Sequence, residues 1–196
     1  MNRRAFLWAG ASVGVILGLG ELGKCAHASR NLLRPPGGQD EARFESLCVK
    51  CDKCVEVCPT DVVAVANLED GITVVRTPKL NFHLGYCNLC MKCIEVCPTG
   101  ALLPIHREAV KIGVARIQRE ICIAWQWGGC MKCYGSCRPK AISKDALDRP
   151  VVDESKCTGC GECEFVCPAS ELRSYKRGQP RGIVVVPLEL RSSGSI

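Results

Sequence analysis

The chain of 196 residues contains few aromatic residues and few histidines. Aromatic side chains make up 5% of it, and histidine occurs three times. Because aromatics do not alternate with basic residues along a groove-like segment, the sequence gives no indication of nucleic acid binding. His83 and His106 lie outside any Ser or Cys arrangement typical of nucleophilic catalysis, and each is interpreted as a surface or capping residue. The sequence therefore indicates no enzyme active site.

A long hydrophobic run is also missing. The uncharged stretch from Ala5 to Gly20 is shorter than the roughly 17 residues needed to span a membrane. It follows the pair Arg3-Arg4, and Ala26-His27-Ala28 offers a cleavage site. Residues 1–28 are therefore predicted to be a twin-arginine signal peptide, which directs the protein to the periplasm or the outer face of the cytoplasmic membrane. The alternative is an uncleaved leader that anchors the protein in the membrane.

Cysteine, in contrast, is abundant, with seventeen residues. All but Cys25 form four copies of one pattern, in which three cysteines at short spacing precede a fourth. Proline follows the fourth cysteine directly in three copies; the third copy is stretched after its first cysteine and continues as Arg138-Pro139. In chain order the motifs are Cys48, Cys51, Cys54 and Cys58; Cys87, Cys90, Cys93 and Cys97; Cys122, Cys130, Cys133 and Cys137; Cys157, Cys160, Cys163 and Cys167.

This spacing is typical of the ligands of a [4Fe-4S] cluster. A tight loop with cysteines three residues apart can reach three iron atoms of the cluster, and the cysteine before proline reaches the cluster of a partner motif. The sixteen motif cysteines therefore predict four [4Fe-4S] clusters. Two pairings remain open: neighbouring motifs, first with second and third with fourth, or a nested order, second with third and first with fourth. Both use the same sixteen ligands.

Zinc and disulfides are the alternative interpretations of so many cysteines. Zinc sites use two Cys-x2-Cys pairs and need neither a third cysteine in the triplet nor a following Cys-Pro. Disulfides are common in exported proteins, but a disulfide framework rarely repeats one register four times. The pattern thus favours iron and sulfide. Since each oxidised cluster with its thiolates carries about −2, the formal charge of +6 is not evidence for nucleic acid binding.

The composition predicts a small α+β fold built around its cofactors, as tandem bacterial dicluster ferredoxin-like domains with short helices and β-hairpins. The hydrophobic fraction of 47% is inflated by cysteine, so the apo chain is expected to be largely disordered. Residues 61–66 and 72–76 are predicted to pair as a hairpin, with further strands within 110–123 and at 183–186. The expected divisions are a signal peptide (1–28), a flexible leader (29–44), motifs one and two (45–107), and motifs three and four with a C-terminal strand (108–196).

Several residues around the third motif are candidates for tuning a cluster. Trp125 and Trp127 lie in its extra loop, where they could shield a cluster from water or simply pack. Positive charge favours the reduced, more negative state of a cluster, so basic residues near this motif predict a raised potential there. A second basic stretch near the C-terminus is either a solvated loop or a docking surface for an acidic partner. The first group is Lys132, Arg138 and Lys140, and the second is Arg173, Lys176, Arg177 and Arg181.

Four features together resemble the ferredoxin-type proteins of the NapG/MauM family: the twin-arginine leader, the order of four motifs, the expanded third motif, and the stretch Cys97-Pro98-Thr99-Gly100-Ala101-Leu102. The resemblance covers nearly the whole chain, and Arg138 is a mild departure. It implies a non-catalytic relay that carries electrons from a membrane-bound quinol-oxidising iron–sulfur protein to a periplasmic reductase or cytochrome. Membrane association would then come through the partner or the leader. The alternatives are a maturation or assembly factor, or a permanently bound iron–sulfur subunit of an exported molybdenum reductase.

Overall fold

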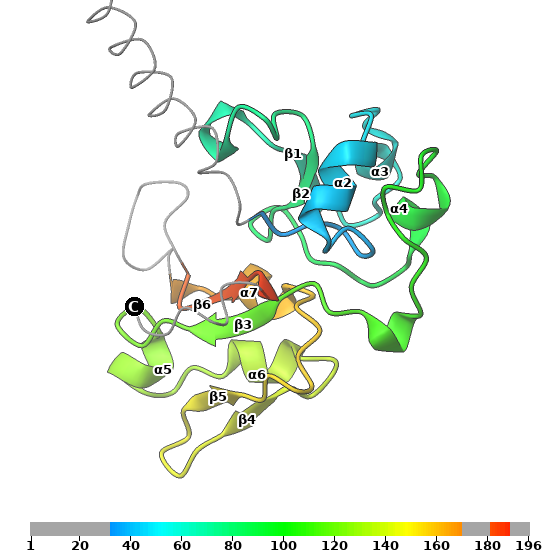
Figure 1. Cartoon of the computed structure of the whole chain (residues 1–196). Helices are drawn as coiled ribbons and strands as arrows, with labels where there is room; N and C mark the ends of the chain where they lie inside the picture. Colours follow the sequence, from blue (N-terminus) through cyan, green and yellow to red (C-terminus); the bar gives the residue numbers. More distant parts are fainter. Residues whose placement is uncertain (1–31, 170–180, 189–196) are drawn as a thin grey trace, which may run out of the picture.

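The computed structural model describes residues 32–169 and 181–188, which form two small units lying against each other (Figure 1). The predicted signal peptide and Cys25 lie outside the described residues. Each unit combines helices of one or two turns with short antiparallel strands, as the sequence predicts. The first unit contains α2 (Glu41–Leu47), α3 (Lys53–Glu56), β1 (Val63–Val65), the 3-10 helix η1 (Leu68–Asp70), β2 (Pro78–Leu80) and α4 (Lys92–Glu95).

The second unit begins after the segment that leads out of α4. Its helices are again short, and no helix in the described residues has the length and apolar character required to cross a membrane. The unit contains η2 (Arg107–Ala109), β3 (Val114–Ile117), α5 (Ile123–Gln126), α6 (Lys132–Ser136), β4 (Ile142–Lys144), β5 (Pro150–Val152), α7 (Glu162–Phe165) and β6 (Ile183–Val186).

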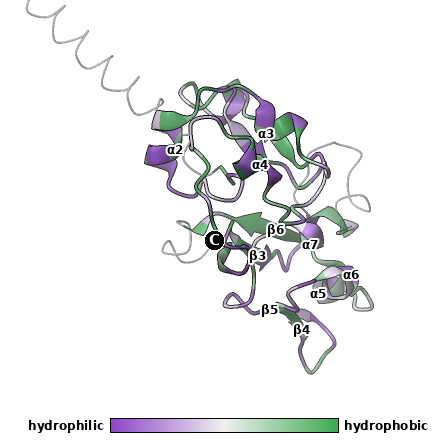
Figure 2. Ribbon diagram, turned by 90° about the vertical axis from the view of Figure 1, so that its right-hand side faces the viewer, coloured by the Kyte–Doolittle hydropathy of each residue, from purple (hydrophilic) through white to green (hydrophobic). Residues whose placement is uncertain are grey.

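The described strands form three antiparallel pairs: β1 with β2, β3 with β6, and β4 with β5. The strands predicted within 110–123 and at 183–186 are present as β3 and β6, and they pair with Val114 opposite Val186. All four residues of β6 and two of the four residues of β3 are β-branched, and such side chains pack well on a pleated surface. Figure 2 shows β3 and the hydrophobic β6 between the first unit and α5, α6 and the β4–β5 hairpin of the second.

The first hairpin differs from the prediction, which pairs residues 61–66 with 72–76. β1 pairs instead with β2, so that Val63 lies opposite Leu80. Two observations explain the shift. Ile72 is 72% exposed, whereas Leu80 is buried, so the later segment supplies the better apolar face. In addition, Arg76 has a φ of 65°, which ends any extended run before residue 77.

Within the described part of the predicted leader (29–44), Arg34 makes specific contacts with the first unit. The guanidinium of Arg34 is buried and donates hydrogen bonds of 2.8 Å to Oε2 of Glu41, Oγ1 of Thr77 and the carbonyl oxygen of Pro78. It also lies 4.7 Å from the centroid of the Phe44 ring. These contacts fix the segment against β2, because a buried guanidinium must have its donors satisfied.

The hydrophobic core is shared between the two units. Val62 and Phe82 of the first unit belong to the same buried group as Val110, Ile112 and Ile183 of the second. Cysteines complete this core: Cys133, Cys157 and Cys163 are buried within it, and further motif cysteines pack around them. The motif cysteines are thus part of the hydrophobic core as well as of the cavities that they line.

Candidate functional site: four cysteine-lined cavities

The structure gathers the sixteen predicted ligands into four cavities of similar volume, each lined by four cysteines. All sixteen are free thiols. Each cavity takes the first three cysteines of one motif and the last cysteine of another. We name them site A, lined by Cys48, Cys51, Cys54 and Cys97; site B, by Cys58, Cys87, Cys90 and Cys93; site C, by Cys137, Cys157, Cys160 and Cys163; and site D, by Cys122, Cys130, Cys133 and Cys167.

The exchange of the last cysteine joins neighbouring motifs. Cys97 of the second motif reaches site A, while Cys58 of the first reaches site B. In the same way, Cys167 reaches site D and Cys137 reaches site C. Of the two pairings that the sequence leaves open, the structure has the neighbouring one, and each unit holds two sites.

Left-handed backbone turns wrap the ligand loops around three of the sites. In the first, second and fourth motifs, the residue before the second cysteine and the residue after it both have positive φ. The residue after it also begins the short helix α3, α4 or α7, which carries the third cysteine. Because the turns alternate with the cysteines, neighbouring thiols are brought to the same side of the loop. The residues are Lys50, Asp52, Leu89, Met91, Gly159 and Gly161.

The third motif reaches site D by a different route. Met131, which follows its second cysteine, has a φ of −133° instead of a left-handed value. The reversal occurs earlier, at Gly128 and Gly129, whose φ values are 82° and 76°. The longer gap after Cys122 thus accommodates α5 and a glycine turn before Cys130. The expanded motif still places its first three cysteines around one cavity although its backbone path differs.

Burial and crowding hold most of the inner thiols in the protonated form in the metal-free chain. Burial raises the pKa of Cys54, Cys93 and Cys133 to about 12 and that of Cys87 to about 11, with further increases from nearby thiols. Thiolates so close together repel one another, so they can ionise together only around a cation. The donor set therefore fits a cationic centre whose positive charge stabilises four thiolates at once, and an iron–sulfur cluster is such a centre.

Hydrogen-bond donors point at the cysteines that cross between motifs. The amide of Ala141 donates to Sγ of Cys137 at 3.2 Å, and Oγ1 of Thr60 lies 3.5 Å from Sγ of Cys58. Burial alone would raise the pKa of Cys58, but hydrogen bonds from Thr60 and from the amides of Val63 and Val62 together lower it. Donors to sulfur stabilise the more negative, reduced state of an iron–sulfur centre. Thr60 was not among the predicted site residues, although Cys-Pro-Thr occurs in the first two motifs.

The four sites follow one another in a row from A to D. The thiol of Cys54 in site A is close enough to raise the pKa of Cys93 in site B, after the larger effect of burial. The thiol of Cys133 in site D has the same effect on Cys163 in site C. Between the units, the amide of Cys87 in site B donates a 2.8 Å hydrogen bond to the carbonyl of Cys160 in site C. Sites A and D are therefore the two ends of the row.

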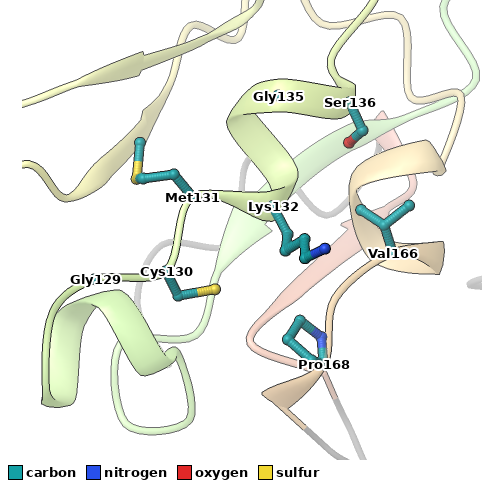
Figure 3. A pocket seen from close by; sticks show the side chains of 8 residues that line it. All are labelled: Gly129, Cys130, Met131, Lys132, Gly135, Ser136, Val166 and Pro168. Atoms are coloured by element: carbon teal, nitrogen blue, oxygen red, sulfur yellow. The ribbon is translucent and has the colours of Figure 1, made fainter.

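An open hollow of about 690 Å³ lies beside site D (Figure 3). The sulfur of Cys130 and the ammonium of Lys132 both point into it, opposite Pro168 and Val166. Lys132 also lines the cavity of site D itself. This end of the row is thus reached from the surface, with one positive charge at its opening.

The basic residues of the third motif do not surround one site. Lys132 lies at site D, but Arg138 and Lys140 follow Cys137, which belongs to site C. Arg138 is moreover paired with Glu162 at 3.0 Å, which offsets its charge. The expectation that all three raise the potential of one cluster is therefore wrong in its grouping, because the last cysteine of the motif crosses to another cavity.

The two tryptophans do not line site D. The ring of Trp125 lies 4.3 Å and 4.2 Å from the guanidinium carbons of Arg119 and Arg149, and its Nε1 donates to the carbonyl of Pro150 at 3.3 Å. Trp127 is 67% exposed. The apolar walls of site D come instead from side chains such as Ile123. Trp125 therefore packs against other residues of the second unit, and neither tryptophan directly shields the cavity of site D.

The remaining candidates lie at the surface or outside the described residues. His83 is exposed, and the exposed His106 precedes η2 as its N-terminal cap residue. Arg173, Lys176 and Arg177 fall outside the described residues. Arg181 is described, and its guanidinium donates to the carbonyls of Glu164 and Phe165, so it fixes the end of α7.

The fold and its thiol-lined cavities are those of a ferredoxin-like iron–sulfur protein, and comparison with known proteins agrees. Residues 47–101 and 108–170 match the model of the 4Fe-4S dicluster domain. "Ferredoxin-type protein NapG" of Escherichia coli (strain K12) is 37% identical over 177 residues, covering 80% of this chain and 74% of that protein. "Methylamine utilization ferredoxin-type protein MauM" of Methylobacillus flagellatus is 37% identical over 175 residues, with coverages of 82% and 74%.

A third relative is shorter. "Ferredoxin-type protein NapF" of Escherichia coli (strain K12) is 30% identical over 146 residues, covering 72% of this chain and 84% of that protein. The chain belongs to the family of ferredoxin-type proteins that includes NapG and MauM. It is accordingly a non-catalytic iron–sulfur protein of electron transfer that binds [4Fe-4S] clusters.

Proposed function

We propose that the chain binds four [4Fe-4S] clusters, one in each of sites A to D, with the sixteen motif cysteines as ligands. The observation that carries this proposal is the presence of four free cysteines in each of four similar cavities. A bound cluster supplies a centre that gains and loses one electron. The domains would then be residues 45–107 and 108–196, each with two clusters.

The protein's own residues would hold the clusters and tune them. The cysteines fix the iron atoms, and apolar residues such as Val62 and Leu80 at site B exclude water. The amide of Ala115, 3.4 Å from Sγ of Cys157, provides a donor at site C. Because donors and exclusion of water differ between sites, the four clusters are expected to have different potentials.

We further infer that the protein is exported by the twin-arginine route and relays electrons from a membrane-bound quinol-oxidising iron–sulfur protein to a periplasmic reductase or cytochrome. The Arg3-Arg4 leader supports export, since that route carries folded, cofactor-loaded proteins. The row of sites supports a relay, because sites B and C lie between its two ends in the order of contacts and each end could face a different partner. The resemblance to NapG and MauM supports the class of pathway.

The first experiment measures cofactor content and redox activity. The full chain is purified without oxygen, iron and acid-labile sulfide are counted, and EPR spectra are recorded during stepwise reduction. We expect about sixteen iron and about sixteen sulfide per chain, with interacting reduced clusters. Zinc in place of iron, or clusters that do not reduce at accessible potentials, would contradict the proposal.

Export and partners need separate tests. A variant with Arg3→Lys and Arg4→Lys should remain in the cytoplasm with its clusters, whereas the parent chain is recovered from the periplasm or the membrane fraction. Equal recovery of both from the periplasm would exclude the twin-arginine route. Addition of membranes containing a quinol-oxidising iron–sulfur protein should reduce the clusters of the exported form; failure of this step alone would reject the donor and leave the clusters established.

A further inference from the structure

The two units meet where site B faces site C. The amide of Cys87 donates a 2.8 Å hydrogen bond to the carbonyl of Cys160, so a ligand loop of the first unit is joined directly to one of the second. These two cysteines line different cavities. Any electron that crosses from one unit to the other along the row has to pass this junction. Its geometry therefore matters more than that of any other contact between the units.

Arg138 spans this junction from its edge. Its Nη2 donates a 2.9 Å hydrogen bond to the hydroxyl of Tyr86, and its guanidinium carbon lies 5.1 Å from the centroid of the Tyr86 ring. Its Nε lies 3.0 Å from Oε2 of Glu162. Tyr86 also packs against Phe165, with the ring centroids 5.8 Å apart. The Arg138 side chain thus connects Tyr86 of the first unit to Glu162 of α7.

The positions of these partners in the sequence are informative. Tyr86 directly precedes Cys87 of site B, Arg138 directly follows Cys137 of site C, and Glu162 directly precedes Cys163 of site C. Arg138 therefore connects three segments that each adjoin a cysteine of one of the two facing sites. A shift of the Arg138 side chain would therefore act on residues that directly adjoin the cysteines of sites B and C.

We propose that Arg138 is a positioning residue that holds the Cys87 loop of site B against site C through Tyr86 and Glu162, and so fixes the separation of the two interior clusters. The proposal rests on the proposed function, since it requires clusters in sites B and C. The other three motifs have proline at the corresponding position, as Pro59, Pro98 and Pro168. Proline can neither donate a hydrogen bond nor reach across a junction.

The energetic weight of Arg138 distinguishes this role from that of a stabilising ion pair. Its side chain is 57% exposed, so the pair with Glu162 is screened by water and adds little to global stability. The planar guanidinium can, however, stack on Tyr86 and bond its hydroxyl at the same time. The expected consequence is local order at the junction without a change in overall stability.

The test uses the cluster-loaded full chain and two readouts besides activity. In Arg138→Gln, the peptide containing Cys87 should exchange its amide hydrogens about tenfold faster, because the stacking and the ion pair are both lost. EPR spectra of the fully reduced protein should show weaker spin coupling between the units. Arg138→Lys retains the ion pair but not the stack and should lie between the two. Tyr86→Phe changes the other side of the junction and should also loosen it.

Arg149→Gln is the matched control. Arg149 has the same kinds of contact, an ion pair with Asp145 at 2.8 Å and a ring at 4.2 Å, but all lie within the second unit. This variant should leave exchange at Cys87 and the spin coupling unchanged. Unchanged exchange and coupling in Arg138→Gln, or equal changes in Arg149→Gln, would overturn the proposal. Iron loss from Arg138→Gln would also overturn it, because Arg138 would then be needed to retain a cluster and not to set the separation between two clusters. Fewer than four clusters in the parent chain would instead refute the proposed function.

Discussion

Gly161 packs directly against the ring of Phe82, across the boundary between the two units. A Cβ placed on Gly161 would lie 2.0 Å from Cδ1 of Phe82, and the residue has a φ of 78°. Phe82 is buried, so its ring has no open space into which it can move. At position 161, glycine is therefore the residue type that fits both the left-handed turn and the close contact with Phe82.

Replacement of Gly161 by alanine should loosen the contact between the units. We expect a loss of about 1–3 kcal/mol, because the new methyl group overlaps Phe82 and the left-handed turn is strained. The temperature at which cluster absorbance is lost should fall by several degrees. Gly135→Ala is the control, since Gly135 lies in α6 with open space around its Cβ position. Equal thermal behaviour of both variants would show that the junction tolerates the methyl group.

Double cysteine variants test the pairing of motifs. In the neighbouring arrangement, Cys48 and Cys97 hold the same cluster, so Cys48→Ala with Cys97→Ala should remove one cluster and leave about twelve iron atoms. Cys48→Ala with Cys167→Ala should remove two clusters and leave about eight. The nested arrangement predicts the opposite result for each pair. Iron and sulfide analysis of the two purified variants therefore decides between the arrangements.

That the cysteines of one motif gather at one cavity could be predicted from sequence because their spacing is local. Cysteines three residues apart are placed by one loop, and the loop forms in any context that supplies the turns. The partner of each fourth cysteine depends on how the units pack, which short-range patterns do not encode. The grouping of Arg138 with Lys132 was wrong for this reason: Cys137 crosses to site C, and Arg138 follows it.

Tertiary contacts explain the other differences. The segment Arg34-Pro35-Pro36-Gly37-Gly38 has the composition of a linker, yet Arg34 is buried because Glu41 and Thr77 satisfy its donors. Residues 72–76 have β propensity, but Pro78 and Leu80 form the strand because they supply the buried face. In both cases the deciding partner lies elsewhere in the chain, and propensity is a weak guide there.

The buried guanidinium of Arg34 should be important for the first unit. Arg34→Met would leave the carboxylate of Glu41 without its partner, and breaking a buried pair costs about 3–5 kcal/mol. Loss of cluster absorbance should then occur at a temperature lower by on the order of 10 °C. Arg116→Met is the control, because the Arg116 side chain is 47% exposed and its 3.7 Å pair with Glu154 should contribute less than about 1 kcal/mol. Similar shifts in both variants would mean that the Arg34 contacts carry no special weight.

Lys132 is the one basic residue of the third motif that lines site D, so its charge should affect that site alone. An exposed charge near a cluster contributes about 1 kcal/mol, and about 59 mV corresponds to 1.4 kcal/mol for one electron. Lys132→Gln should therefore lower one midpoint potential by a few tens of millivolts, because the reduced and more negative cluster loses a favourable charge. Lys140→Gln should leave this potential unchanged, since Lys140 follows Cys137 of site C. EPR-monitored titration of the two variants measures both shifts. If the same midpoint potential changed in both variants, the two lysines would act on one site, which would contradict the separation of sites C and D in the structure.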